Sequence, residues 1–369
     1  MSAAFSVERA SHVKVLGSYG LGPNFMNALT KVSDWKGYFR DIGLPVEIID
    51  RHLILVEKQL SSRVPVIFDV EHLAKLLGVS DAYLASAISV PEFHYRNFSI
   101  PKKSGGTRNI SSPRSALKDV QRWILKNILY SASPSSVAMG FRHDRSILDH
   151  AKTHCHSPYI LKLDVADFFP SIKFSRVIGL YQGFGYSAGV AYTLASLCCL
   201  DGSLPQGAAT SPALSNLVCR RLDVRLYSLA KKLRLKFSRY ADDMAFSGRS
   251  LNLSVLPLVK LILAEEGFEL RDDKTRLYSE GAKRILTGLS ASMSGVKLLR
   301  KDRRELRAVF HEIRKYGIIG YIFSHKIRDP LFLDRLIGKF SFWCFIEASC
   351  KFPREATVYL KKIKLENGM

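Results

Sequence analysis

The chain has 369 residues, and 47% of them are hydrophobic, a composition typical of a folded protein and not of a disordered segment. Its 55 Lys and Arg residues against 33 acids give a formal net charge of +22, which indicates a polyanionic partner, most often nucleic acid and less often an anionic membrane surface. No apolar run approaches the roughly 20 residues of a membrane span, and the six cysteines show no metal-ligand spacing.

The first residues and the cysteines also indicate a compartment. No basic segment leads into an apolar one at the start, so we expect no secretory signal. Cysteines without a pairing pattern are typical of small buried side chains in a reduced cytoplasm. We therefore expect a cytoplasmic nucleic-acid protein with no membrane partner.

The N-terminal part predicts helices and little chemistry. Residues 1–64 contain one expected helix, at 46–60. The stretch 69–88 resembles a helix-turn-helix in its "LAKLLGVS", which would make the protein a DNA-binding regulator. The second helix, "SDAYLASAI", has no Arg, Lys, Asn or Gln to read base edges, so we favour an ordinary packed helix pair.

The stretch 95–113 predicts a hairpin with a charged turn. Two short apolar strands flank "KKSGG", a glycine turn with basic residues on both sides. An amphipathic helix follows, with apolar residues at helical spacing from Leu117 to Ile128.

The central part mixes strands with helices. Residues 159–172, "YILKLDVADFFPSI", begin as an alternating strand and end in acids and aromatics. A helix is expected to start at 211, with Ser211 as N-cap and Pro212 in the first turn. The stretch 237–248, "FSRYADDMAFSG", predicts two strands around an acidic tip. A helix at about 251–266, a short β region to about 299 and a basic helical part to 369 complete an α+β class with a mostly antiparallel sheet.

The acidic tip needs an explanation, because two adjacent carboxylates repel unless a proton or a cation neutralises them. One interpretation is a turn in which Asp242 and Asp243 are ordinary turn residues. The other is a metal site: Asp164 ends the preceding strand, and pairing of the two elements in one sheet would bring three carboxylates together. Nucleotide polymerisation on two divalent metal ions needs carboxylates from separate segments, and Mg²⁺ prefers oxygen ligands.

Three motifs resemble the central motifs of reverse transcriptases in sequence, order and spacing: "LKLDVADFF" (161–169), "LPQGAATSPALSNL" (204–217) and "YADD" (240–243). The resemblance extends over about 65–300 and is closest to bacterial retron reverse transcriptases. It implies a right-hand polymerase with fingers, an antiparallel-sheet palm and a helical thumb. The expected domains are an N-terminal helical extension at 1–64, fingers and palm at 65–299, and a basic helical thumb at 300–369.

The resemblance implies roles around the metal ions. Asp164, Asp242 and Asp243 match the catalytic, metal-binding aspartates, which would hold two Mg²⁺ ions, with Mn²⁺ as a possible substitute. Tyr240 matches the tyrosine that packs beside the primer end. Lys274 matches a position proposed to protonate pyrophosphate.

Other positions match nucleotide-binding residues. Phe169 matches the aromatic that excludes a 2′-hydroxyl, although an ordinary core role stays open. Gln206 and Gly207 match the loop that lies along the nucleotide and template. Arg108, with Lys102 or Lys103, matches the cations of the fingers that hold the triphosphate. A solvated charged turn is the alternative for these three cations.

Two segments are expected to bind RNA. Residues 140–154 resemble the retron segment before the first catalytic Asp; His150 replaces its usual Asn, and the closing His154 remains. In 299–317 the apolar residues should face the protein, and a basic stripe should contact phosphates unless it is only a solvated face. The stripe comprises Arg300, Arg303, Arg304, Arg307 and Arg314.

The resemblance implies an RNA-directed DNA polymerase that copies its own structured non-coding RNA from a 2′-hydroxyl of that RNA. The product would be a branched RNA–DNA hybrid made from dNTPs, with a role in antiphage defence beside a separate effector protein. Group II intron, diversity-generating or other defence-associated reverse transcriptases are the alternatives in the same class. An RNA-directed RNA polymerase more often carries Gly-Asp-Asp in place of "YADD". A non-catalytic RNA-binding scaffold is the alternative from another class.

Overall fold

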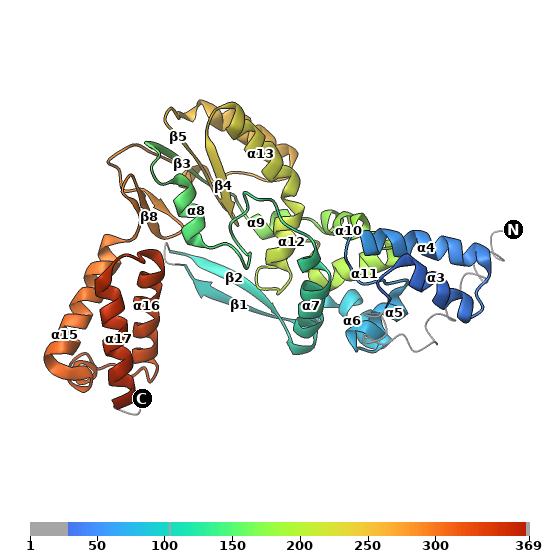
Figure 1. Cartoon of the computed structure of the whole chain (residues 1–369), viewed down its shortest axis with the longest axis horizontal. Coiled ribbons are helices and arrows are strands. Elements are labelled where there is room, and N and C mark those ends of the chain that lie inside the picture. Colours follow the sequence, from blue (N-terminus) through green and yellow to red (C-terminus); the bar gives the residue numbers. More distant parts are fainter. Residues whose placement is uncertain (1–28, 103–104, 367–369) are drawn as a thin grey trace. The chain divides into compact units, whose positions relative to one another are not determined.

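The structure, a computed structural model, describes residues 29–102 and 105–366 (Figure 1). Their contacts divide the chain into two compact units. Unit 1 consists of Met1–Phe141, Val165–Arg225 and Lys260–Glu269, and unit 2 consists of Arg142–Asp164, Leu226–Val259 and Leu270–Met369. Helices stand apart from antiparallel sheets in both, which confirms the α+β class.

Unit 1 begins, in its described part, with two helices that share an aromatic core. Trp35 and Phe39 are fully buried one turn apart on α3 and pack with Val56 of α4 and with Phe68. The sequence analysis found α4 but not α3. The next two helices pack against each other, and Leu84 of the second is buried. The sequence analysis favoured such a packed pair over a DNA-reading helix-turn-helix. These elements are α3 (Val32–Asp41), α4 (Val46–Ser61), α5 (Val70–Leu77) and α6 (Asp81–Ser89).

The expected charged hairpin is present in unit 1. Its strands pair antiparallel along their whole length, and the backbone of Lys102 closes the turn by donating to Gly106 O at 2.9 Å. The strands are β1 (Tyr95–Pro101) and β2 (Thr107–Pro113), and helices follow them in unit 1. These helices are α7 (Ser115–Asn127), α9 (Phe168–Ser171), α10 (Phe174–Gly183), α11 (Ala188–Cys198) and α12 (Ser211–Val218).

The helix at 211 differs in detail from the prediction. It begins at Ser211, so Thr210 and not Ser211 is the N-cap. The Ser211 hydroxyl instead donates to Pro205 O at 2.8 Å, inside the preceding loop. The helix ends at Val218, with Cys219 as its C-cap, and α13 (Arg220–Lys232) follows as a separate helix.

Unit 2 is built on a four-stranded antiparallel sheet with the order β4-β5-β3-β6. The β4–β5 hairpin is the predicted one, and β5 pairs with β3. Because side chains alternate along a strand, Ser238, Tyr240, Asp243 and Ser247 share one face of the sheet, the face on which α8 lies. The bounds are α8 (Ile147–His154), β3 (Tyr159–Asp164), β4 (Lys236–Tyr240), β5 (Asp243–Gly248) and β6 (Arg276–Tyr278).

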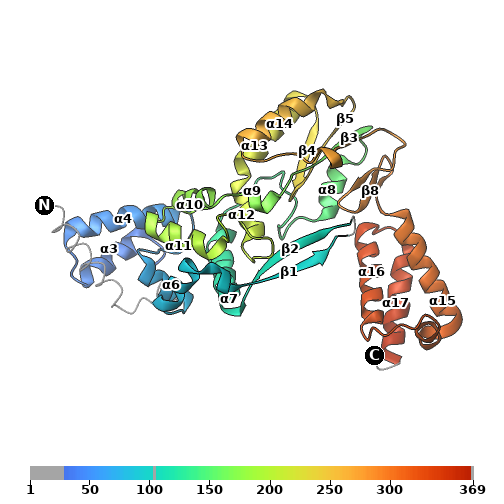
Figure 2. The ribbon, with the colours of Figure 1, turned by 180° about the vertical axis from the view of Figure 1, so that it is seen from behind.

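A small sheet and a bundle of three helices complete unit 2. The helices lie side by side in both views of the ribbon (Figures 1 and 2). Their core includes Leu306, Phe310 and Ile313, as the helical spacing predicts, and also Leu148 and Ala151 from α8. The first helix is kinked at Gly317, whose φ of 72° lies outside helical values. The elements are β7 (Ile285–Leu286), β8 (Leu289–Ser292), β9 (Gly295–Leu298), α15 (Arg300–Ser324), α16 (Phe332–Ile346) and α17 (Lys351–Glu366), and α14 (Leu256–Glu265) precedes them.

Candidate active site

Three carboxylates meet at one end of the unit 2 sheet. Asp164, the last residue of β3, lies directly opposite Asp243, the first residue of β5. Asp243 in turn pairs with Tyr240 across the hairpin, so that Ala241 and Asp242 form its tip. Ala241 has a φ of 55°, which is uncommon for a residue other than glycine and is often found at functional sites.

The carboxylates repel one another. The pKa of Asp242 is raised from its ordinary value by burial first, and then by the charges of Asp243 and Asp164. Burial also raises the pKa of Asp243, although the Lys162 ammonium acts in the opposite direction. A cation bound among these groups would relieve the repulsion.

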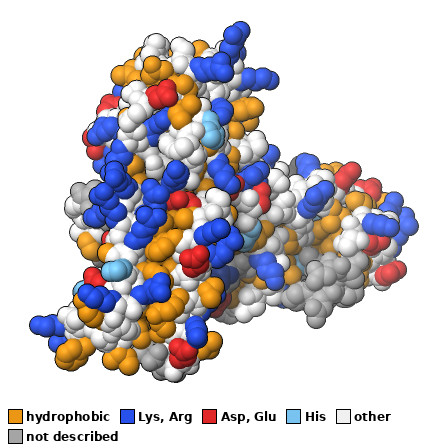
Figure 3. Space-filling model, turned by 60° about the vertical axis from the view of Figure 1, so that its left-hand side comes forward, with side chains coloured by type: hydrophobic (Ala, Val, Ile, Leu, Met, Phe, Trp, Pro, Cys, Tyr) orange, Lys and Arg blue, Asp and Glu red, His pale blue; other side chains and the backbone are white. Residues whose placement is uncertain are grey.

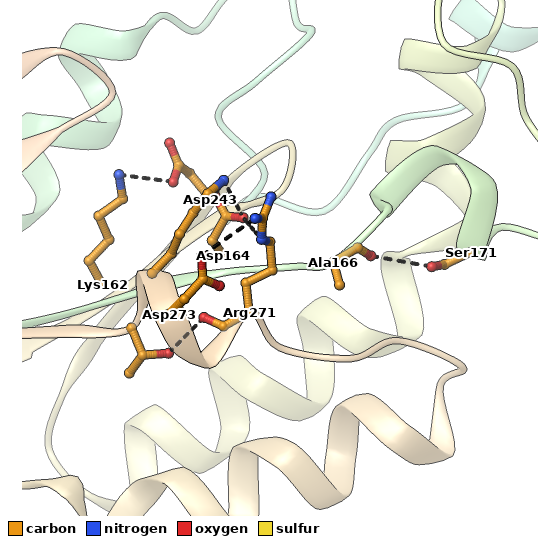
Figure 4. Close-up of polar contacts among 9 residues, drawn as sticks. Lys162, Asp164, Ala166, Ser171, Asp243, Arg271 and Asp273 are labelled. Carbon is orange, nitrogen blue, oxygen red and sulfur yellow. Dashed lines mark hydrogen bonds and ion pairs between the residues drawn. The ribbon is translucent and has the colours of Figure 1, made fainter. Parts of the chain in front are cut away.

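Lysines contact two of the carboxylates. Lys274 Nζ donates to both oxygens of Asp164, at 2.9 and 3.0 Å. Lys162 Nζ forms an ion pair with Asp243 Oδ1 at 3.1 Å (Figure 4). Arg271 contributes its backbone N–H, which donates to Asp164 O at 2.8 Å. The sequence analysis missed Lys162, although its position two residues before Asp164 on the same strand face was a usable signal.

The residues present fit a divalent cation. No group of three or more His, Cys, Asp or Glu side chains in the described ranges has ready metal-site geometry. The three carboxylates nevertheless supply only hard oxygen donors, which Mg²⁺ prefers, and burial and mutual repulsion raise the pKa of Asp242. Asp164, Asp242 and Asp243 are therefore the residues that would hold the metal.

In unit 1, the loop that contains Gln206 and Gly207 lies against the charged hairpin. Ser111 N donates to Gln206 O at 2.9 Å. Gly207 has a φ of +127°, and a Cβ at this position would lie 2.8 Å from Ser111 O and 2.8 Å from Ile110 Cγ2. Only glycine meets both conditions.

Gln121 is a further positioning residue that the sequence analysis missed. Its side chain is fully buried. Nε2 donates to Tyr95 OH and to Leu197 O, both at 2.9 Å, and Oε1 accepts from Ala209 N at 3.0 Å. It thus ties the loop of Gln206 to β1 and α11. The available signal was a polar residue next to the apolar stripe of α7.

Two neighbouring phenylalanines differ in their surroundings. Phe168 is 5% exposed and stacks on Phe268 with ring centroids 5.9 Å apart. Phe169 is only half-buried and lies 6.1 Å from the Phe141 ring. The core interpretation therefore suits Phe168, whereas Phe169 keeps part of its surface exposed.

The cations of the hairpin turn lie on the surface. Lys102 and Arg108 are both exposed. A triphosphate contact requires this exposure, and a solvated charged turn would show it as well. Lys103 lies outside the described residues.

The expectation that His154 contacts RNA needs correction. Its side chain is fully buried, and both ring nitrogens are engaged, one by Ser247 Oγ and the other by Ser238 Oγ, each at 2.8 Å. A side chain with no exposed surface and no unused nitrogen cannot bind RNA directly. His150 is equally buried and contacts the same Ser238 hydroxyl at 2.8 Å.

Three of the five stripe arginines have partners inside unit 2. Arg303 forms an ion pair with Glu347 at 3.7 Å. The Arg307 guanidinium lies over the Trp343 and Phe352 rings, and Arg314 lies over the ring of Tyr359 at 5.7 Å.

The other two arginines line a basic groove. Arg300 and Arg304 are exposed and border a groove of about 560 Å³ between the β7–β9 sheet and the start of α15. Figure 3 shows Lys and Arg side chains gathered in clusters on the face that it draws. The groove residues are Lys283, Ser290, Lys297, Leu298, Leu299, Arg300, Lys301, Arg303 and Arg304, with no acid among them.

Within the described part of the chain, the helices are all too short or too polar to cross a bilayer.

Comparison with known proteins places the chain in one family. Residues 100–330 match the family described as reverse transcriptase (RNA-dependent DNA polymerase). The retron Ec86 reverse transcriptase of Escherichia coli is 31% identical over 308 residues, which cover 82% of this chain and 92% of the relative. The retron Mx65 and Mx162 reverse transcriptases of Myxococcus xanthus are 38% and 34% identical, covering 71% and 74% of this chain and 67% and 62% of their own lengths. The chain therefore belongs to the retron reverse transcriptases, and it is an RNA-directed DNA polymerase with the right-hand polymerase fold.

Proposed function

We propose that this enzyme copies part of its own structured non-coding RNA into single-stranded DNA, starting from a 2′-hydroxyl of that RNA and leaving a branched RNA–DNA product. Similarity over 92% of the Ec86 retron enzyme supports the retron type of reaction. The chemistry is carried by one observation, the meeting of Asp164, Asp242 and Asp243 at one end of the sheet. A role in antiphage defence, with a separate effector protein, belongs to the same proposal.

The three aspartates would hold two Mg²⁺ ions, or Mn²⁺ as a substitute. Bound divalent ions activate the attacking hydroxyl and neutralise charge on the phosphates. Lys274, which donates to Asp164, would give a proton to the leaving pyrophosphate, and Tyr240 would pack beside the primer end.

Unit 1 would bind the incoming nucleotide. The exposed Lys102 and Arg108 hold the triphosphate, and Lys103, outside the described residues, belongs to the same prediction. Phe169 excludes a 2′-hydroxyl. The loop of Gln206 and Gly207, where Gly207 approaches β2 closely, would lie along the nucleotide and template.

Replacement of Asp242 tests the carboxylate assignment. Asp242→Asn removes one charge with no change in shape, so DNA extension on an RNA template at normal Mg²⁺ should be lost. The melting temperature should not fall, because the wild-type carboxylate is buried beside two others that raise its pKa.

Asp273→Asn is the matched control. Asp273 is an exposed carboxylate that pairs with Arg271 at 3.4 Å, and its replacement should leave extension unchanged. Wild-type rates in the Asp242→Asn variant would exclude the metal assignment.

The priming chemistry needs its own experiment. The enzyme is incubated with the structured RNA encoded beside it and dNTPs, and the RNA–DNA junction is mapped. Substituting a 2′-deoxynucleotide at the junction should abolish the product while extension of an annealed DNA primer continues. If that RNA primes as well without the 2′-hydroxyl, the proposal of 2′-priming is wrong although the polymerase activity stands. Loss of protection against phage in cells that carry Asp242→Asn tests the role in defence.

A further inference from the structure

Four buried polar side chains form a continuous hydrogen-bonded chain between α8 and the β4–β5 hairpin. His150 and His154 lie one turn apart on α8, and Ser238 and Ser247 lie on β4 and β5; all four are fully buried. His150 Nδ1 and His154 Nε2 both lie 2.8 Å from Ser238 Oγ, and His154 Nδ1 lies 2.8 Å from Ser247 Oγ.

The number of protons couples the bonds of this chain. The Ser238 hydroxyl has one proton, so within the chain it can donate to one imidazole while it accepts from the other. With neutral rings the three bonds then all point the same way, in either of two directions, and each direction sets one tautomer for each ring. Burial favours the neutral rings, since it lowers the pKa of His150 to about 3 and that of His154 well below its ordinary value.

The chain contacts the strands immediately behind the catalytic tip. Ser238 is two residues before Tyr240 and faces the same side of β4, and Ser247 shares the corresponding face of β5 with Asp243. The His150 ring lies 6.2 Å from the Tyr240 ring. Hydroxyl groups on a buried strand face are costly without partners, so α8 is fixed to the hairpin by directional bonds as well as by apolar contacts.

We infer that His150, His154, Ser238 and Ser247 are positioning residues of the polymerase reaction, which hold the hairpin tip at 240–243 in place against β3. This inference rests on the carboxylate assignment proposed above. It gives the retron-like segment that ends at His154 a function inside the protein in place of RNA binding. It also accounts for His150 where that segment usually has Asn: the Asn amide is attached to Cγ, as Nδ1 is, and can reach the same Ser238 hydroxyl.

Two substitutions of His150 separate positioning from mere packing. His150→Phe keeps a ring in the cavity but offers no polar atom to Ser238. His150→Asn keeps the polar atom but leaves most of the ring volume empty. Packing therefore favours the Phe variant and positioning favours the Asn variant, so the two roles predict opposite rankings.

The experiment measures melting temperature and the kcat of single-nucleotide extension on an RNA template. The Asn variant should melt at the lower temperature yet extend nearly as fast as wild type. The Phe variant should melt closer to wild type but lose about tenfold or more in kcat, since a misplacement of about 1 Å at a reacting group can cost ~10²-fold. Ser238→Ala should lose rate as the Phe variant does. If the rates instead follow the melting temperatures, the four residues are structural only and the inference is overturned.

Thr153→Ala supplies the control on the same helix. Thr153 Oγ1 donates to Asp149 O at 2.9 Å within α8 and has no part in the chain, so kcat should be unchanged. A loss equal to that of His150→Phe would assign the effect to α8 stability and also overturn the inference. Failure of the carboxylate assignment would appear separately, as undiminished extension by Asp242→Asn on the same template.

Discussion

Phe169 and Phe168 together offer a controlled test of sugar selection. Phe168 is buried against Phe268, whereas Phe169 is only partly buried. Truncation of a buried phenylalanine costs about 3–5 kcal/mol, so Phe168→Ala should destabilise the protein strongly. Phe169→Ala should cost less, because full burial of a phenylalanine contributes about 1.5–3 kcal/mol and Phe169 is only partly buried.

The functional effects should be reversed. Removing the Phe169 ring opens space beside the sugar of the nucleotide, so discrimination against ribonucleotides should fall. A pocket that rejects one small group contributes about 1–3 kcal/mol, or 10- to 200-fold, and the preference for dNTP should fall by a factor in that range. Phe168→Ala should keep the wild-type preference in whatever fraction of the protein remains folded.

The assay is single-nucleotide insertion of a dNTP and the matching ribonucleotide on one RNA template, with kcat/KM for each, beside thermal melting of the same preparations. A Phe169→Ala variant that melts like wild type and still rejects ribonucleotides would refute the role in sugar selection. If Phe169→Ala destabilises the protein as much as Phe168→Ala does, Phe169 is an ordinary core residue.

Three further predictions concern the groove, the lysine and acid stability. Replacing Arg300 and Arg304 by Gln should weaken RNA binding and flatten its salt dependence by about 0.7–0.9 log units per lost contact. Arg307→Gln, which removes a contact to two rings, should lower the melting temperature without changing the slope of RNA affinity against salt. Equal slopes in all variants would leave the groove without a role in RNA binding. Lys274→Gln should slow extension by about 10²-fold or more if the lysine is the proton donor, and an unchanged rate would leave it as an ion-pair partner only. His72 is buried, and burial lowers its pKa to about 4. As the pH falls through about 6.5, the unfolded chain therefore binds a proton at this residue before the folded protein does. Between about pH 6.5 and pH 4 the free energy of unfolding should decrease by up to ~1.4 kcal/mol per pH unit. His72→Phe should flatten the fall of melting temperature between pH 7 and 4.5, and parallel curves would contradict the assignment.

Local patterns in the sequence predicted the part of the site that depends on strand alternation and turn chemistry. The alternation around Asp164 and across Asp242 and Asp243 identified three strands, and the repulsion of adjacent acids left an ordinary turn and a shared cation as the two interpretations. The structure has these strands, and β3 pairs directly with β5. The division at 64 and 299, and the roles of the site residues in catalysis, stay predictions.

What could not be predicted depends on partners far apart in the sequence. Arg303 pairs with Glu347, 44 residues later and on no shared helix face, so no i,i+4 rule could find the pair. His154 resembled a surface residue of an RNA-binding segment, and its burial follows from two serines more than 80 residues away. The missed helix α3 is different, because Trp35 and Phe39 at i,i+4 spacing were a readable signal.

Helix α8 touches two parts of unit 2 at once. His150 and His154 reach into the hairpin that carries the aspartates, while Leu148 and Ala151, on the adjacent side, belong to the core of the three-helix bundle. At 1.5 Å per residue, its eight residues span only about 12 Å. The helix therefore connects the hairpin that carries the aspartates to the core of the three-helix bundle through little more than two helical turns, so a substitution that shifts α8 should be felt on both sides.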